Sequence, residues 1–322
     1  MIVLETAKIL GLALAAALVS CSDPPAVDTT DAGSDLDSDS DADTDSDADT
    51  DTDTDGDSDG DTDTDTGEPP YQFSVEEVGG FPAGVHGMAF AADGTLYFSD
   101  SYAHVDSVER VYTLAAPYTG EPVPTGIAGD IVSGLSWAAG SLYVSVTGED
   151  RVDRYDEALA LQESWDVPAP WNTAWVGPGM MAVTYDGLVL GLDEAGATTE
   201  ILSSLAYPFG IADNGDNTFW ISQQVGAEDD GIVSRFGLCG DELQVVDHVF
   251  SNPEGMALDD RGYLYAADTV AGEVVRVSPA GEAELITVEY EIPIVVARSP
   301  DGDIWFNTGG AQSRLVRISL TD

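Results

Sequence analysis

The chain has 322 residues, and its 60 Asp and Glu residues against 10 Lys and Arg residues give a formal net charge of −50 at pH 7. Binding to nucleic acid requires a basic surface that displaces counterions from phosphates, so this composition argues against nucleic acid as a partner. Residues 71–322 alone contain 39 acidic residues, nine Arg and no Lys. Such an excess suits a saline medium, in which salt screens the repulsion between like charges.

Residues 1–21 have the pattern of a secretion signal. Lys8 precedes an apolar run over residues 9–19, which is shorter than the roughly 20 apolar residues that span a bilayer. The run ends in Leu18-Val19-Ser20-Cys21, which resembles the lipobox of bacterial lipoproteins. The resemblance implies a signal peptide cleaved before Cys21, lipid attachment to Cys21, and anchoring at the outer membrane or cell surface, because Ser22 and not Asp follows the cysteine. An ordinary signal peptide that happens to end in cysteine is the alternative.

Residues 22–70 form a predicted disordered acidic linker. They contain nineteen Asp, one Glu and no Lys or Arg. Without apolar surface to bury, such a segment cannot offset the entropy lost on ordering, and its like charges extend it.

The Asp-rich part of the linker invites a calcium interpretation. An EF-hand loop requires a bidentate Glu at its twelfth position. Counting from Asp51 or from Asp55 gives Thr62 or Thr66 at that position. We therefore favour a loose atmosphere of cations over a defined calcium site.

Residues 71–322 contain a repeat. Five short apolar runs each include an arginine, at intervals of 44, 81, 41 and 41 residues: Arg110, Arg154, Arg235, Arg276 and Arg317. A period in the forties is typical of a four-stranded propeller blade. The interval of 81 equals two periods, so one of six copies lacks its arginine near residues 190–200.

The strand pattern is clearest in the fifth copy. Short apolar runs over 255–258, 263–268, 273–277 and 284–288 are separated by turns rich in Gly, Pro and Asp, which predicts an antiparallel meander. In the third copy, 179–183 and 188–192 are interpreted as the first and second strands, and the third strand is missing or merged into 198–202. We predict one all-β domain, a six-bladed β-propeller of four-stranded antiparallel blades.

The ring needs a closing strand, because blade six reaches the C-terminus with only three strands. Residues 71–78 alternate as a strand does. We predict that they pair with blade six and so remove an open sheet edge.

The repeated arginines and aromatic residues have a structural and a functional interpretation. A ring of arginines could bind an anion, but each arginine could equally pair with an acid at the end of the neighbouring second strand, such as Asp100 or Asp268. We favour the structural role. The aromatic residues of the second strands are expected to pack between blades: Tyr97, Tyr143, Trp220, Tyr265 and Trp305.

The pattern of Gly-Met/Ile-Ala, a turn, Gly-x-Leu-Tyr and Val-x-Arg resembles the NHL-repeat and gluconolactonase-like six-bladed propellers. That resemblance implies one divalent metal on the axis, held by a Glu in the first blade and by Asn and Asp before a glycine in later blades. The matching positions here are His86-Gly87, Phe209-Gly210 and Glu254-Gly255. One acid among three expected ligands argues against a hard-metal site. Residues 301–308 also resemble the last blade of streptogramin lyases, whose histidines near the end of the ring have no counterpart after His248.

The remaining candidate site is the mouth of the ring. Starts of first strands and ends of second strands would gather there, with Trp171 and Trp175 on the loop into blade three. The predicted ligand-binding residues are His86, Tyr102, Trp175, Phe209, Gln223, Glu254, Asp268 and Asn307, with Ile294 beside them. No catalytic triad, HExxH motif or phosphate loop is present in the sequence.

Aromatic and hydrogen-bonding groups without a nucleophile suit the binding of a carbohydrate, a peptide or an envelope protein. We therefore favour a monomeric, non-catalytic binding or scaffolding module at the cell envelope, with no cofactor and no metal. The alternative is a divergent metal-dependent lactonase that uses Glu254, Asp268 and a divalent ion such as calcium.

Overall fold

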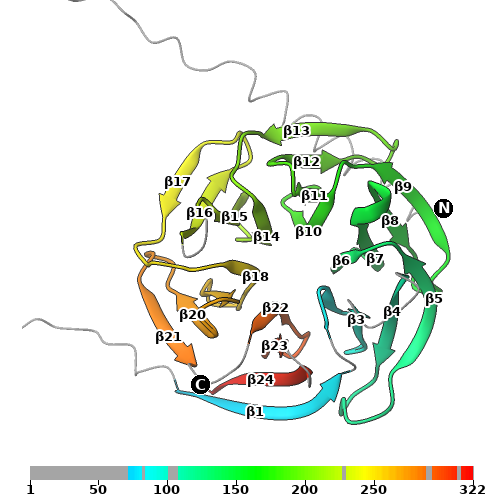
Figure 1. Cartoon of the computed structure of the whole chain (residues 1–322), viewed down its shortest axis with the longest axis horizontal. Helices are drawn as coiled ribbons and strands as arrows, with labels where there is room; N and C mark the ends of the chain where they lie inside the picture. The colour runs from blue at the N-terminus through cyan, green and yellow to red at the C-terminus, as the bar shows by residue number, and fades with distance from the viewer. Residues whose placement is uncertain are drawn as a thin grey trace, which may run out of the picture. The chain divides into compact units, whose positions relative to one another are not determined.

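The computed structural model describes residues 72–81, 84–100, 108–226, 230–287, 292–309 and 313–321. The predicted signal peptide, lipidated Cys21, acidic linker, Tyr71 and Tyr102 lie outside the described residues. Within them, no helix has the length and apolar character needed to cross a membrane. The strands form six four-stranded antiparallel sheets around a central axis (Figure 1). This arrangement confirms the predicted all-β, six-bladed propeller.

In each blade the first strand lies nearest the axis and the fourth lies on the outside (Figure 1). Blade one contains β2 (Met88–Phe90), β3 (Leu96–Asp100), β4 (Glu109–Leu114) and β5 (Val123–Gly129). Blade two contains β6 (Val132–Ala138), β7 (Ser141–Val146), β8 (Arg151–Tyr155) and β9 (Leu161–Asp166), with a short 3-10 helix η1 (Thr147–Glu149) between β7 and β8. Blade three contains β10 (Pro170–Val176), β11 (Gly179–Thr184), β12 (Val189–Leu192) and β13 (Thr198–Leu202).

The last three blades repeat this order. Blade four contains β14 (Pro208–Asp213), β15 (Thr218–Gln224), β16 (Gly231–Gly237) and β17 (Glu242–Val245). Blade five contains β18 (Pro253–Leu258), β19 (Leu264–Asp268), β20 (Glu273–Val277) and β21 (Ala283–Thr287). Blade six contains β22 (Pro293–Arg298), β23 (Ile304–Thr308), β24 (Ser313–Thr321) and, as its outermost strand, β1 (Gln72–Phe81).

Strand β1 closes the ring as predicted. It pairs antiparallel with β24 from Gln72 opposite Thr321 to Phe81 opposite Ser313, with a bulge between Glu77 and Gly79. The outer edge of β24 is thereby covered, which removes an unpaired edge from the sheet.

Blade three corrects one prediction. Its inner strand is β10, so 179–183 belongs to the second strand and 188–192 to the third, while Thr198–Leu202 is a complete fourth strand. The prediction of a missing or merged third strand is therefore wrong. Gly179-Met-Met-Ala imitates the Gly-Met-Ala pattern of an inner strand, whereas β10 itself has Asn172 where blades one, two, four and five have glycine.

The glycine of the repeat has a steric cause. A Cβ on Gly210 would lie 2.3 Å from the carbonyl oxygen of Glu254, and one on Gly255 would lie 2.5 Å from that of Ile294. At these two positions the neighbouring inner strands approach each other through their backbones, which leaves room only for glycine.

The core lies between blades rather than within them. The buried cluster shared by blades one and two, for example, combines Tyr97 and Val111 with Leu135 and Val144. All five residues of β3, of β19 and of β23 are buried, because second strands have blades on both faces. The aromatic residues of the second strands contribute to this interblade packing, in line with the structural interpretation.

Four of the repeated arginines share one register, and the fifth does not. Arg154, Arg235, Arg276 and Arg317 lie opposite Tyr143, Trp220, Tyr265 and Trp305 respectively. Opposite Tyr97 lies Thr113, and Arg110, three residues before Thr113, lies opposite Asp100. The equivalent position in blade three is Gly191, opposite Met181, inside the predicted range for the lost arginine.

The arginines in register join the second and fourth strands. Arg154 and Arg276 form ion pairs with Glu163 at 3.2 Å and Glu284 at 2.5 Å, both on outer strands. Arg317 pairs with Glu76 of β1 at 2.5 Å, and its guanidinium lies 5.6 Å from the Trp305 ring. These contacts favour the structural role. The predicted partners at the ends of the second strands are not the ones seen in these ion pairs.

Candidate functional site at the mouth of the ring

Six equivalent residues line the mouth. In each blade one inner-strand residue lies opposite the aromatic residue of the second strand, or opposite Met181 in blade three. The residue three positions before it is equivalent in all six blades: His86, Ser133, Trp171, Phe209, Glu254 and Ile294. We refer to these six residues as the mouth ring. His86, Phe209, Glu254 and Ile294 occupy the positions predicted for them. Ser133 was not predicted, and Trp171 belongs to β10 rather than to a loop.

The mouth ring forms a constriction. His86, Trp171, Glu254 and Ile294 line a space of about 10 Å³, which is at the lower limit for one water molecule.

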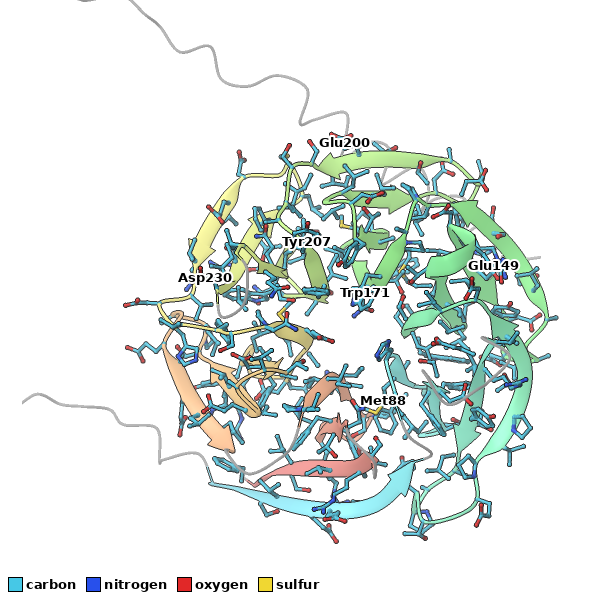
Figure 2. The ribbon with its side chains drawn as sticks, viewed as in Figure 1. Met88, Glu149, Trp171, Glu200, Tyr207 and Asp230 are labelled. Atoms are coloured by element: carbon cyan, nitrogen blue, oxygen red, sulfur yellow. The ribbon has the colours of Figure 1, made fainter. Side chains whose placement is uncertain are left out.

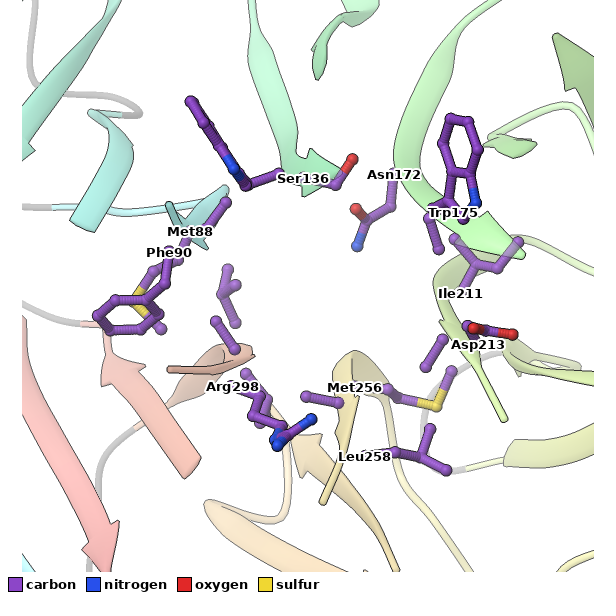
Figure 3. Close-up of a pocket in the computed structure, with 18 of the residues that line it drawn as sticks. Met88, Phe90, Ser136, Asn172, Trp175, Ile211, Asp213, Met256, Leu258 and Arg298 are labelled. Carbon is purple, nitrogen blue, oxygen red and sulfur yellow. The ribbon is translucent and has the colours of Figure 1, made fainter. Parts of the chain in front are cut away.

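The axial space widens beyond the constriction. A cavity of about 660 Å³ continues toward the far ends of the inner strands, within the size range of small-molecule sites. Figure 3 shows Met88, Phe90, Trp175, Asp213, Leu258 and Arg298 around it. The roomiest part of the channel thus lies at the end opposite to the predicted mouth.

Trp175 was predicted at the mouth, but the structure places it along this wider cavity. It lies four residues after Trp171 on β10, and its indole N–H donates to the carbonyl of Gly177 at 3.1 Å. A repeated proline in the sequence could have identified β10 as the inner strand of blade three. Proline stands immediately before the mouth-ring residue in blades three to six: Pro170, Pro208, Pro253 and Pro293.

A chain of aromatic contacts extends from the mouth ring to the surface. The ring centroid of Trp171 lies 6.0 Å from that of His86, 5.6 Å from Phe209 and 5.8 Å from Tyr185. Tyr185 in turn lies 5.4 Å from Tyr207. Tyr185 and Tyr207 are 42% and 53% exposed, and Figure 2 shows Trp171 near the axis with Tyr207 farther out. This aromatic chain presents two open tyrosine faces beside the mouth.

Burial shifts the pKa values of the two titratable side chains in the mouth ring. Desolvation lowers the pKa of His86 to about 4, so its imidazole is neutral at neutral pH. Desolvation also raises the pKa of Glu254 to about 7, reinforced by Asp268 and opposed by hydrogen bonds from Thr269 and Asn252. The amide of Asn252 donates to Glu254 Oε1 at 2.9 Å. The mouth is therefore less acidic than the surface around it.

The predicted residues at the ends of second strands have structural contacts. The carboxylate of Asp268 accepts backbone N–H groups of Ser251, Asn252 and Ala271 at 2.6, 2.9 and 3.2 Å. Asn307 accepts from the N–H of Val295 and donates to the carbonyl of Val85, which ties blade six to blade one.

Gln223 is similarly used, since its Oε1 accepts the N–H of Ala206 at 3.1 Å. Gln223, Asp268 and Asn307 are all buried. Their polar atoms hold the loops of the mouth in place, so the structure does not bring them together with the mouth ring as a ligand surface. Tyr102 lies outside the described residues.

The donor set does not fit the metal centre that the family resemblance implies. The mouth ring offers one carboxylate, one imidazole and one hydroxyl, and the Ser133 hydroxyl already donates to the carbonyl of Pro170. Among the residues that the structure describes, no group of three or more His, Cys, Asp or Glu side chains is placed to hold a metal ion.

Comparison with known proteins supports the fold and leaves the chemistry open. No family model matches the chain, and no curated protein matches it in sequence. A gluconolactonase from Xanthomonas campestris superposes with a TM-score of 0.63 at 16% identity, covering 77% of this chain and 90% of that one. The PQQ-bound aldose sugar dehydrogenase from Streptomyces coelicolor gives a TM-score of 0.60 at 15% identity, covering 79% and 100%.

Virginiamycin B lyase from Staphylococcus aureus gives a TM-score of 0.55 at 13% identity, covering 78% of this chain and 88% of that one. A lactonase, a dehydrogenase and a lyase on one scaffold illustrate that function resides in the site rather than in the fold. At these identities the likeness shows the architecture alone: this chain has the six-bladed β-propeller fold seen in gluconolactonase-like proteins and virginiamycin B lyase.

Proposed function

We propose that this protein is a lipid-anchored component of the bacterial cell envelope, and that its propeller binds a ligand at the mouth without catalysing a reaction. Lipid on Cys21 attaches the chain to the membrane, and the acidic linker holds the propeller away from it. The ligand is a component of the envelope or its surroundings, such as a carbohydrate, a peptide or a protein.

The aromatic chain is the observation that carries the proposal. Large aromatic side chains that remain exposed on a protein surface are typical of ligand recognition, because they supply contact area at a low cost in side-chain entropy. Tyr185 and Tyr207 have this exposure, and both are braced through ring contacts with Trp171 or with each other.

Tyr185→Ala should weaken this binding by about tenfold, the effect of removing a well-placed interface aromatic. The full chain would be immobilised and exposed to polysaccharide and protein fractions of the envelope, and the retained material measured. Leu161→Ala is the matched control, since Leu161 is 57% exposed but lies on outer strand β9. Equal retention by Tyr185→Ala and the wild type would contradict binding at the mouth.

A metal-dependent lactonase is the second candidate, favoured by Glu254. A carboxyl group with a pKa of about 7 can act as a general acid or base near neutral pH. We expect the purified full chain to contain no stoichiometric divalent ion and to be inert to a panel of lactones. Hydrolysis that depends on calcium or another divalent ion, and that is lost in Glu254→Gln but kept in the exposed-site control Glu157→Gln, would replace the binding proposal by the enzymatic one.

A further inference from the structure

Exposed apolar side chains gather on one face of the propeller. Fourteen large hydrophobic residues of the described chain are exposed. Four of them lie on the connections that lead into inner strands: Ile131, Tyr207, Val249 and Ile292. Four more lie between second and third strands: Val108, Tyr185, Val225 and Val270. All these connections end at the mouth of the ring, and we refer to this surface as the mouth face.

The opposite face has a different composition. The remaining six exposed residues lie on outermost strands, for example Val123 on β5 and Leu243 on β17. No described turn of the opposite face carries an exposed large hydrophobic residue. Those turns are built instead on Asp and Gly, as in 214–217 and 259–262. Both faces are formed by connections within and between the same six blades. The structure of the blades alone therefore does not explain why the exposed apolar loop residues lie on one face only.

Three of the exposed residues also have a strained backbone. Ile131, Tyr207 and Ile292 have φ values of 54°, 39° and 53°, a region that glycine adopts freely and that is a true outlier for a β-branched residue. Each stands immediately before an inner strand, and its carbonyl accepts an N–H from the end of a second strand: that of Thr147, Gln224 or Gly309. Five of the six blades have a positive φ at this position, with Gly84 and Ala169 in blades one and three, and glycine is the unstrained choice there.

An exposed apolar side chain at such a position contributes little to the core and adds strain to the fold. Strained residues that packing does not explain are concentrated at functional sites. The strain, the exposure and the location on one face point together to an interaction surface.

Charge indicates what this surface accepts. Exposed acids accompany the apolar residues: Asp130 precedes Ile131, Asp186 follows Tyr185, and Asp247 lies two residues before Val249. The arginines Arg151 and Arg314 at this face are ion-paired, with Glu149 and Asp153 and with Glu77 respectively. An apolar surface set among unneutralised carboxylates is complementary to a ligand that is both cationic and apolar.

We propose that the mouth face docks a cationic polypeptide whose Lys or Arg residues are interspersed with apolar side chains. This inference rests on the proposed binding function and narrows its ligand to one class. The apolar loop residues contact the apolar side chains of the partner, and the acids beside them contact its basic residues.

The test selects ligands for the immobilised full chain from a displayed library of random short peptides. We expect the enriched peptides to combine basic and apolar residues. A synthesised enriched peptide should bind about tenfold or more weakly to the triple variant Ile131→Gly/Tyr207→Gly/Ile292→Gly. Because glycine relieves the strain, the melting temperature of this variant should not fall, which separates binding from folding.

Two further variants sharpen the comparison. Ala139→Gly is the matched control, since Ala139 has φ 50° but lies in a turn of the opposite face, and it should bind as the wild type does. Asp130→Asn/Asp186→Asn/Asp247→Asn should weaken binding several-fold and reduce its dependence on salt. The acidic linker is present in every variant, so its own attraction for cationic peptides does not contribute to the difference in affinity between them.

Enrichment of acidic or neutral peptides, or full affinity of the triple glycine variant, would overturn the inference. If no peptide is selected but a polysaccharide is retained and then lost in Tyr185→Ala, the inference fails and the proposed function stands. If neither peptide nor envelope material is retained, both fail.

Discussion

Deletion of Gln72–Phe81 from the full chain should lower the melting temperature by about 10 °C or more. Nine residue pairs join β1 to β24, and all are lost together. Arg314 and Arg317 lose their ion pairs with Glu77 and Glu76. A loss of about 4 kcal/mol or more follows from the exposed edge and lost packing, and each kcal/mol lowers the melting temperature of a domain of this size by roughly 2–4 °C. Thermal unfolding followed by circular dichroism measures the effect.

The loss extends beyond one blade, because β1 contacts both neighbours of blade six. Phe73 packs against the core cluster shared by blades five and six, and Val78 packs against the cluster shared by blades six and one. The Phe73 ring also lies 6.0 Å from the guanidinium of Arg276 in blade five. The deletion should therefore broaden the transition as well as shift it, since the ring opens at the joint between its first and last blades.

A permuted chain provides the control for this deletion. Gln72 lies opposite Thr321, so the segment Gln72–Phe81 could follow β24 through an Asn-Gly turn and pair with it as a hairpin. We expect this relocated strand to restore most of the lost stability. An unchanged melting temperature after the deletion, or no recovery in the permuted chain, would contradict closure by β1.

The repeat made most of the fold predictable. Runs such as Leu96–Asp100 and Leu264–Asp268 are buried on both faces in every blade, so their apolar character survives in each copy. The missing arginine was predictable for the same reason, and its position falls at Gly191. The order of the strands in blade three was not predictable. Gly179-Met-Met-Ala has the glycine and apolar residues of an inner strand, whereas the true inner strand β10 lacks that glycine.

The site was less predictable than the fold for a related reason. His86, Phe209, Glu254 and Ile294 could be assigned to the mouth by their spacing from a glycine or an apolar strand. Tyr185 could not, because it lies between the second and third strands of the blade whose phase was wrong. Asp268 and Asn307 show the opposite error. Polar residues at strand ends suggest a ligand surface when only the sequence is known, but here their polar atoms bind backbone groups of an adjacent loop and of β22.

Cys21→Ser should move the whole protein from the membrane fraction to the soluble fraction. Acyl chains supply membrane affinity at about 0.8 kcal/mol per buried CH₂, and a single signal gives only marginal attachment unless a second chain or a basic segment assists it. This chain has no basic segment to assist: nineteen Asp and one Glu follow Cys21 in residues 22–70, and an anionic lipid surface repels them. Under the proposed anchoring, attachment depends entirely on the lipid, so its loss should be all-or-none rather than partial.

Fractionation of cells that express the full chain, after metabolic labelling with a fatty-acid analogue, measures this effect. Wild type should be labelled and pelleted with membranes, whereas Cys21→Ser should be unlabelled and soluble. Ser22→Asp provides the matched control, because it keeps the attachment cysteine. This variant should still be labelled and membrane-bound, but it should no longer be found in the outer membrane. The 49 residues after Cys21 can extend to at most about 160–175 Å, so the propeller should stay accessible to a protease added outside its membrane. A Cys21→Ser protein that is still labelled, or an unlabelled wild type, would refute the lipid anchor and leave the binding site at the mouth unaffected.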